Sequence, residues 1–267
     1  MLLAIDIGNT NITYGVFDGE TLQATWRMAT EVRRQPDEYA AMLMTLLAHD
    51  GIPKKSLDRG IISCVVPPLT ATFEELCTRF FHIRPIVVGA GTRTGMRILY
   101  ENPREVGADR VCHAVAAHRL YGAPLIIVDF GTATVFDAIT REGDYLGGAI
   151  CPGINLAAEA LFQHASKLPR IEIVQPKAAI GRNTVASMQA GLFYGYIGLV
   201  EGLVARFQRE LGGGAKVVAT GGLSRLIAAD TKVIDVVDYD LVLTGLRLLY
   251  ELNEKPSGPG LGDHAHR

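Results

Sequence analysis

The sequence lacks the long apolar segments and the basic stretches that mark several classes of protein. No apolar run approaches the roughly 18 residues that a membrane-spanning helix needs, and the start, MLLAID, carries no basic leader. The formal net charge is −2, from 26 basic and 28 acidic residues, and the basic residues form no block. We therefore expect neither a membrane nor a nucleic acid to be a partner.

Paired cysteines are lacking too. The four cysteines are scattered without a Cys-x-x-Cys pair, at Cys64, Cys77, Cys112 and Cys151. This pattern is typical of reduced core residues in a cytoplasmic protein. A hydrophobic content of 48% with 20% charged residues is that of a soluble globular enzyme.

The chain is organised around the turn at residues 5–11, Ile-Asp-Ile-Gly-Asn-Thr-Asn. An apolar run from Leu2 predicts a buried strand that ends near Asp6, and a second strand follows at 12–17. Gly8 permits a backbone geometry that a Cβ would forbid, and it lets a ligand approach the main chain. Free N–H groups and small polar side chains suit phosphate oxygens, and Asp6 is well placed to hold a metal. An ordinary β-hairpin with a polar turn is the alternative.

The same pattern occurs again at residues 125–134, Leu-Ile-Ile-Val-Asp-Phe-Gly-Thr-Ala-Thr. An apolar strand again leads to Asp129, one apolar residue, Gly131 and then hydroxyl side chains. The two copies lie too far apart for a solenoid repeat but suit two related halves. A third turn, Gly-Gly-Leu-Ser at 221–224, follows an apolar strand at 216–220.

The order of the remaining elements agrees with two halves. The first half is expected to have the order β-β-β-α-β-α-β. The first hairpin and a strand at 26–30 come first, followed by a helix that starts at Pro36. A strand at 60–66, closed by Pro67 and Pro68, a helical stripe at 73–81 and a strand at 85–89 complete it. A helix that starts near Asp109 is expected just before the second half begins. For the second half we expect, besides the second hairpin, a strand-to-helix passage at 147–154 and helices at 155–165, from 183 or 184 to 211 and at 239–252. A disordered tail is expected at 255–267.

One predicted helix carries four glycines on one face, Gly191, Gly195, Gly198 and Gly202. Glycine costs a helix interior about 1 kcal/mol per residue, so such a face indicates that another backbone packs closely against it. That backbone could belong to a partner subunit or to another helix of the same chain.

Two Asp-x-Gly turns with a later Gly-Gly turn resemble the superfamily of actin, sugar kinases and chaperone ATPases. The resemblance implies an α/β protein in which two ribonuclease H-like halves face each other across an ATP cleft. The two Asp-x-Gly turns would grip the phosphates of ATP, and the third turn would touch the adenosine. We expect one half at 1–115 and the other at 116–254.

A structured loop, held by Pro103 and Gly107, leads to Asp109 at the start of a predicted helix. A carboxylate at a helix N-terminus is favoured in its ionised form by about 0.3–1 kcal/mol. We therefore expect Asp109 to be deprotonated at neutral pH and free to accept a proton. The alternative is that Asp109 only caps the helix.

Five motifs, in this order, resemble the type III pantothenate kinase family: 6–11, 102–110, 129–134, 147–154 and 181–184. The resemblance extends from Leu3 to about Leu252. It implies that ATP and pantothenate are converted to 4′-phosphopantothenate and ADP, the first step of coenzyme A synthesis. It also implies a homodimer, which would favour a partner subunit at the glycine face.

The resemblance further implies a role for particular residues. Asp109 would be the general base, Asp6 would lie near Mg²⁺, and Asp129 would hold a monovalent cation, K⁺ or NH₄⁺. ATP would be bound by Asp6, Ile7, Gly8, Asn9, Thr10, Asn11, Ile12, Thr13, Thr132, Gly221 and Gly222. Pantothenate would be bound by Tyr100, Gly107, Ala108, Asp109, Arg110 and Thr184.

The two phosphate turns contain no Lys or Arg. Phosphoryl transfer depends on positioning and charge neutralisation, so the cations and backbone dipoles would have to neutralise more of the charge. Two alternatives stay open: a kinase for another small alcohol or a sugar, and an ATP-binding regulatory protein without catalysis, such as a transcription accessory factor. The loop at 102–110 favours pantothenate over other alcohols.

Overall fold

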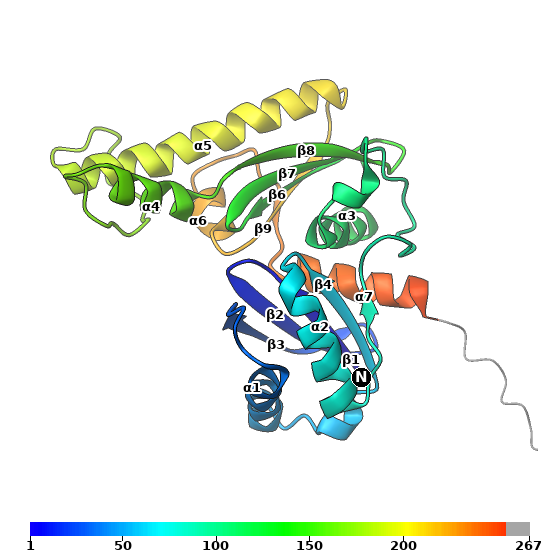
Figure 1. The fold of residues 1–267 in the computed structure, drawn as a ribbon. Coiled ribbons are helices and arrows are strands. Elements are labelled where there is room, and N and C mark those ends of the chain that lie inside the picture. Colours follow the sequence, from blue (N-terminus) through cyan, green and yellow to red (C-terminus); the bar gives the residue numbers. More distant parts are fainter. Residues whose placement is uncertain (255–267) are drawn as a thin grey trace, which may run out of the picture.

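The computed structural model describes residues 1–254, and the predicted disordered tail at 255–267 lies outside the described residues. Two five-stranded sheets form the framework, with strand orders β3-β2-β1-β4-β5 and β10-β9-β6-β7-β8 (Figure 1). In each sheet the first three strands along the chain form an antiparallel meander, and the last two are added in parallel beside the first of them. The two halves therefore share one topology.

The first sheet is built from the first part of the chain. Its strands are β1 (Leu2–Ile7), β2 (Asn11–Asp18), β3 (Thr21–Ala29), β4 (Arg59–Cys64) and β5 (Ile86–Val87). The connecting elements are α1 (Pro36–His49), a short 3₁₀ turn (Lys54–Ser56), α2 (Pro67–Glu75) and the π-helical turn Leu76–Phe80 that continues it. The predicted order β-β-β-α-β-α-β is confirmed.

The second sheet contains β6 (Leu125–Phe130), β7 (Ala133–Ile139), β8 (Tyr145–Pro152), β9 (Lys216–Thr220) and β10 (Val236–Val237). Its helices are α3 (Ala108–Tyr121), α4 (Ile154–His164), α5 (Thr184–Glu210), α6 (Ser224–Ala228) and α7 (Leu241–Asn253), and a 3₁₀ turn (Pro103–Glu105) precedes α3. Asn183 caps α5 by accepting a hydrogen bond from the N–H of Ala186 at 2.8 Å, so one of the two predicted cap residues is confirmed.

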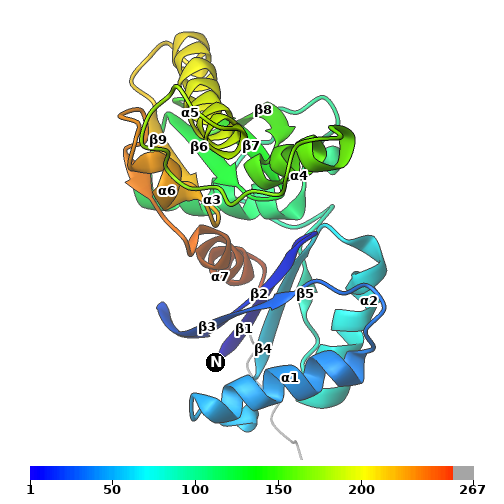
Figure 2. The same cartoon turned by 90° about the vertical axis from the view of Figure 1, so that its left-hand side faces the viewer.

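Three apolar clusters hold the molecule together. One lies between the first sheet and α1 and α2, and another lies between the second sheet and α5. The third joins the two halves, because it contains residues of both sheets together with α3 and α7. Figure 2 shows α7 lying between the two sheets, and α7 packs against α3, β1 and β4.

Two predictions about local structure are wrong. The strand predicted at 60–66 ends at Cys64, and Pro67 and Pro68 begin α2 instead of only closing the strand. Proline suits the first turn of a helix because no N–H is needed there. The alternative that Asp109 caps α3 is also wrong, because Gly107 is the N-cap residue.

The glycine face of α5 is open. Gly191, Gly195, Gly198 and Gly202 are all exposed, and no described atom lies within 4 Å of a Cβ built on any of them. Packing of an internal helix on this face, one of the two alternatives, is therefore wrong for residues 1–254. Within the same residues, no helix combines the length and the apolar character that crossing a bilayer requires.

Candidate active site

The first phosphate turn joins β1 to β2. The register pairs Asp6 with Thr13 on β2 and with Ser63 on β4, and the N–H of Gly8 donates to the carbonyl oxygen of Asn11 at 3.0 Å. Thr30, just beyond β3, supports the turn, because its hydroxyl donates to the carbonyl oxygen of Gly8 at 2.6 Å.

The second phosphate turn joins β6 to β7 and is one residue shorter than the first. Asp129 pairs with Val135 on β7 and with Thr220 on β9, and the N–H of Gly131 donates to the carbonyl oxygen of Ala133 at 3.1 Å. Its support is Gly153, the N-cap residue of α4, whose N–H donates to the carbonyl oxygen of Thr132 at 3.0 Å.

The two turns meet. The hydroxyl oxygens of Thr10 and Thr132 lie 2.6 Å apart, although 122 positions separate these residues along the chain. Both side chains are exposed, so the contact lies where a ligand can reach it from solvent.

The third turn lies against the second. Gly221 has φ of +87°, and a Cβ there would lie 2.6 Å from Oδ1 of Asp129 and 2.7 Å from the backbone nitrogen of Phe130. Both the left-handed backbone and the space therefore require glycine at this position. The hydroxyl of Ser224 donates to the carbonyl oxygen of Gly221 at 2.7 Å and closes the turn.

Three carboxyl groups act on one another at the centre. Burial and the negative charges of Asp109 and Asp129 raise the pKa of Asp6 to about 7. Burial also raises the pKa of Asp129, with a further contribution from the charge of Asp109. Oδ1 of Asp6 is buried without a hydrogen-bond partner, so this oxygen is available to a ligand.

Asp109 stands in the first turn of α3, where its Oδ1 accepts a hydrogen bond from the N–H of Arg110 at 2.7 Å. A Cβ at Gly107 would lie 2.5 Å from the same oxygen. Glycine at this position therefore leaves room for the carboxylate, which is only partly buried.

Two further residues predicted to bind substrate lie together. The guanidinium carbon of Arg110 lies 5.9 Å from the ring centre of Tyr100 and 5.9 Å from that of Tyr145. Gly147, at φ of +129°, allows the ring of Tyr100 to approach, because a Cβ there would lie 3.3 Å from it.

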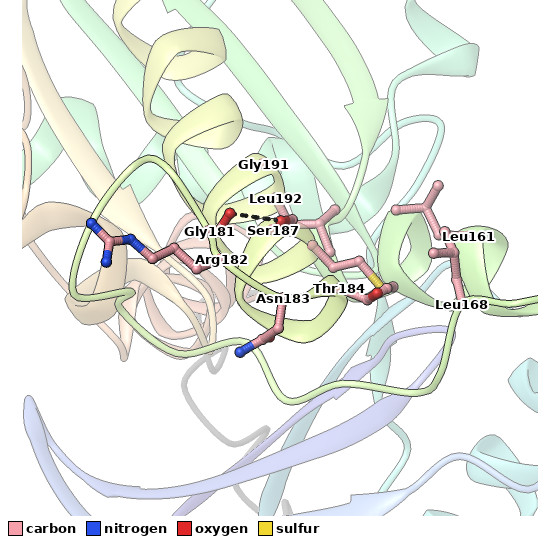
Figure 3. Close-up of a pocket in the computed structure, with 10 residues that line it drawn as sticks. Leu161, Leu168, Gly181, Arg182, Asn183, Thr184, Ser187, Gly191 and Leu192 are labelled. Carbon is pink, nitrogen blue, oxygen red and sulfur yellow. Dashed lines mark hydrogen bonds between the residues drawn. The ribbon is translucent and has the colours of Figure 1, made fainter.

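Thr184 is not brought to these residues. It stands at the N-terminal end of α5, which lies at the opposite end of the second half from α3 (Figure 1). There it lines a hollow of about 730 Å³ with Leu161, Asn183 and Leu192 (Figure 3). None of the other residues predicted to bind pantothenate lines this hollow.

The sequence interpretation missed several residues that shape the site. Asp137 and Tyr145 hold Arg110. Buried His113 offsets part of the rise in the pKa of Asp6 and of Asp129. A carboxylate within the largely apolar strand Ala133–Ile139 was a signal for Asp137. His113 follows Asp109 by four positions, which places the two on one face of α3.

Among residues 1–254 there is no group of three or more His, Cys, Asp or Glu side chains arranged to hold a metal ion. The donor set nevertheless suits a cation held largely by phosphates and water, because Mg²⁺ in such sites takes only one or two carboxylates from the protein. The unpartnered oxygen of Asp6 and the absence of Lys and Arg from both phosphate turns fit this arrangement.

Solved structures with the same fold define the class. The chain resembles a Campylobacter jejuni protein described as a Baf family transcriptional activator, with a TM-score of 0.61 and 19% identity over 94% of this chain and 98% of that one. It also resembles a Sinorhizobium meliloti protein described as a 2-dehydro-3-deoxygalactonokinase, with a TM-score of 0.58 and 13% identity over 94% and 98%. At these identities the likeness shows the fold alone, the two-half fold of actin and the sugar kinases. Together with the paired turns, it places the chain among proteins of that fold.

The sequence comparisons identify the family. The type III pantothenate kinase family profile matches residues 2–206. The chain is 54% identical over 253 residues to the type III pantothenate kinase of Myxococcus xanthus, covering 95% of this chain and 99% of the relative. It is 53% identical over 253 residues to that of Geobacillus sp. strain WCH70, covering 95% and 98%. The chain belongs to the type III pantothenate kinase family.

Proposed function

We propose that the protein transfers the terminal phosphoryl group of ATP to the hydroxyl of pantothenate, giving 4′-phosphopantothenate and ADP for coenzyme A synthesis. The observation that carries the proposal, beside family membership, is the meeting of the two turns at Thr10 and Thr132, 2.6 Å apart. The charge of Asp109 acts there on both Asp6 and Asp129. Turns that meet from two halves suit a phosphate chain held between them.

Asp109 is the proposed general base. It takes the proton of the pantothenate hydroxyl as that oxygen attacks the terminal phosphorus of ATP, and ADP departs. Its place in the first turn of α3, where its charge acts on Asp6 and Asp129 of the two turns, supports this role.

The proposed ATP-binding residues are those of the three turns: Asp6, Ile7, Gly8, Asn9, Thr10, Asn11, Ile12, Thr13, Thr132, Gly221 and Gly222. Asp6 would hold Mg²⁺ or its waters, and Asp129 would hold K⁺ or NH₄⁺. Bound cations neutralise the charge that develops on the phosphates. The chain's own contribution is to hold these carboxylates beside the turns, and its support is the unpartnered oxygen of Asp6.

Tyr100, Gly107, Ala108 and Arg110 are the proposed pantothenate contacts from one chain. We propose that Thr184 reaches the site from a second copy in a homodimer, because it lies away from α3 in its own chain (Figure 1). The exposed glycine face of α5 gives the second copy a surface that its backbone can approach closely.

The first test is an assay of ADP release with ATP, Mg²⁺ and pantothenate, in K⁺ and again in Na⁺. The expected result is turnover that requires pantothenate and is stimulated by K⁺. Measurable ATP binding without turnover on pantothenate would contradict the proposal. A panel of other alcohols and sugars would then test the second kinase alternative, and inactivity on all of them would favour the regulatory one.

The homodimer has its own test, in which two inactive variants are mixed. Asp109→Asn and Thr184→Arg chains are unfolded together, refolded and assayed. If each site combines Asp109 of one chain with Thr184 of the other, mixed dimers contain one intact site, and about a quarter of the unaltered activity returns. A mixture that stays inactive, although mixed dimers are shown to form, would contradict the shared site.

A further inference from the structure

A buried ion pair joins the proposed substrate-binding residue Arg110 to Asp137. Nε and Nη2 of Arg110 donate to Oδ1 of Asp137 at 3.1 and 2.7 Å. The two residues are only 8% and 1% exposed. They come from different elements, α3 and β7, so the pair also ties the helix that carries Asp109 to the second sheet.

Tyr145 completes the arrangement. Its hydroxyl donates to the same Oδ1 of Asp137 at 2.6 Å, and its ring lies on the guanidinium of Arg110 at 5.9 Å. The ring of Tyr100 lies at the same distance from this group. Both the direction and the plane of the guanidinium are therefore fixed by contacts within the chain.

The second sheet makes room for this arrangement with glycine. Asp137 is opposite Gly148 on β8, where a Cβ would lie 3.0 Å from Oδ1 of Asp137 and 1.7 Å from the carbonyl oxygen of Phe136. Gly147, the next residue back, admits the ring of Tyr100. Gly148 thus leaves room for Asp137, and Gly147 leaves room for the Tyr100 ring that lies beside Arg110.

Stability alone is a weak reason for such a pair. The cost of removing two charges from water often matches or exceeds their attraction, and apolar residues of similar size can replace a buried pair without loss. A guanidinium offers five N–H donors, and Asp137 occupies the edge formed by Nε and Nη2. The hydrogen bonds to Asp137 do not involve Nη1, so this nitrogen is the donor that a substrate oxygen would meet.

We propose that Asp137 is a positioning residue for pantothenate, acting through Arg110. It touches no reacting atom. It holds the guanidinium at the angle at which Nη1 meets the substrate. It also offsets the positive charge of Arg110, so that the direction of the hydrogen bond from Nη1, and not the net charge of the site, selects the ligand. The inference rests on the proposed function.

The test compares Michaelis constants for the two substrates in Asp137→Asn. The expected result is a rise of about tenfold or more in KM for pantothenate, with KM for ATP changed by no more than about twofold. Glu251→Gln is the matched control, because it removes the carboxylate partner of another buried arginine, Arg247, on α7. Its two KM values are expected to stay unchanged.

A double-mutant cycle separates positioning from folding. In an Arg110→Ala background, Asp137→Asn is expected to change KM for pantothenate by less than about twofold, because Asp137 acts only through Arg110. Equal effects of Asp137→Asn in both backgrounds, or an unchanged KM for pantothenate with a lower melting temperature, would overturn the inference.

Tyr145→Phe serves if Asp137→Asn does not fold, because it removes one hydrogen bond to Asp137 without changing charge. We expect KM for pantothenate to rise about threefold, and an unchanged value would overturn the inference. Unaltered protein that binds ATP but does not turn over pantothenate would overturn the proposed function, and this inference with it. Normal turnover with unaffected KM in these variants would overturn the inference alone.

Discussion

The two phosphate turns follow one plan but differ in length and in what supports them, because the N–H of Gly8 bonds three residues on, to Asn11, and that of Gly131 two residues on, to Ala133. In each, an Asp near the end of a strand precedes a glycine whose N–H closes the turn, at 3.0 Å for Gly8 and 3.1 Å for Gly131. A side-chain hydroxyl from Thr30 supports the first turn, whereas the backbone N–H of Gly153 supports the second. The first support can be removed by deleting one oxygen atom. The second can be disturbed only by adding atoms.

The largest effect on activity is expected from Asp109, whose charge acts on the carboxylates of both turns. Asp109→Asn should lower kcat about 10²- to 10⁴-fold, the usual contribution of a general base. The measurement is kcat at saturating ATP and pantothenate, together with the melting temperature, which should stay close to that of the unaltered protein. Asp37→Asn is the control, because Asp37 also stands in the first turn of a helix, α1. A kcat near the unaltered value would rule out Asp109 as the base.

The next effect concerns the carboxylates of the two turns. The pKa of Asp6 is about 7 in the folded protein against an ordinary value of 3.8. The folded state therefore binds the extra proton, and metal-free stability falls as pH rises from about 4 to about 7. Asp6→Asn should raise the unfolding free energy by a few kcal/mol at about pH 8 and leave it unchanged at about pH 3.

Chemical denaturation in the presence of a chelator measures this effect. Asp129→Asn is expected to act in the same direction, because burial raises its pKa too. Loss of stability in Asp6→Asn at about pH 8 would show that the Asp6 carboxylate is favourable in the metal-free fold, contrary to the expected pH dependence.

A smaller effect is expected from the support of the second turn. In Gly153→Ala, the new Cβ would lie 2.3 Å from the carbonyl oxygen of Thr132 and 2.7 Å from that of Gly131. The turn has to shift, at a cost of about 1–3 kcal/mol in stability, and KM for ATP should rise. Gly89→Ala is the control, since a Cβ there meets nothing within 4 Å. Equal KM values for ATP in both variants would contradict a strict requirement for glycine.

The smallest effect is expected from the support of the first turn. Thr30→Val removes the hydrogen bond to the carbonyl oxygen of Gly8 and should cost about 1 kcal/mol of stability, with a modest rise in KM for ATP. Thr45→Val is the control, because its hydroxyl also donates to a backbone carbonyl, that of Ala41, but on the surface of α1. If Thr30→Val were the more damaging of the two support variants, the comparison of the turns would be reversed.

The sequence was most informative where chemistry and backbone geometry are local. Both Asp-x-Gly turns between strands could be predicted, because Asp, Gly and hydroxyl residues stand within a few positions of one another. The start of α2 was misplaced, because a pair of prolines can end one element or begin the next, and only the packing of the helix decides between them.

Contacts between distant segments could not be predicted. Arg110 and Asp137 are 27 positions apart, and their pairing depends on how α3 packs against β7. The apolar stripe of α7 indicated a helix but not that it would pack against the first sheet. Likewise, the motif containing Thr184 gave no sign that α5 carries it away from α3 (Figure 1).

The position of α7 bears on the order in which the protein can fold during synthesis. The first sheet packs one face against Leu241, Leu243 and Leu246 of this helix, and Leu243 reaches within about 3 Å of where a Cβ on Gly15 would stand. The ribosome adds these residues only after it has added more than 200 residues beyond β1. Until then the nascent first half exposes an apolar face, and a chain that stops before α7 keeps it exposed, a state prone to aggregate or to recruit chaperones.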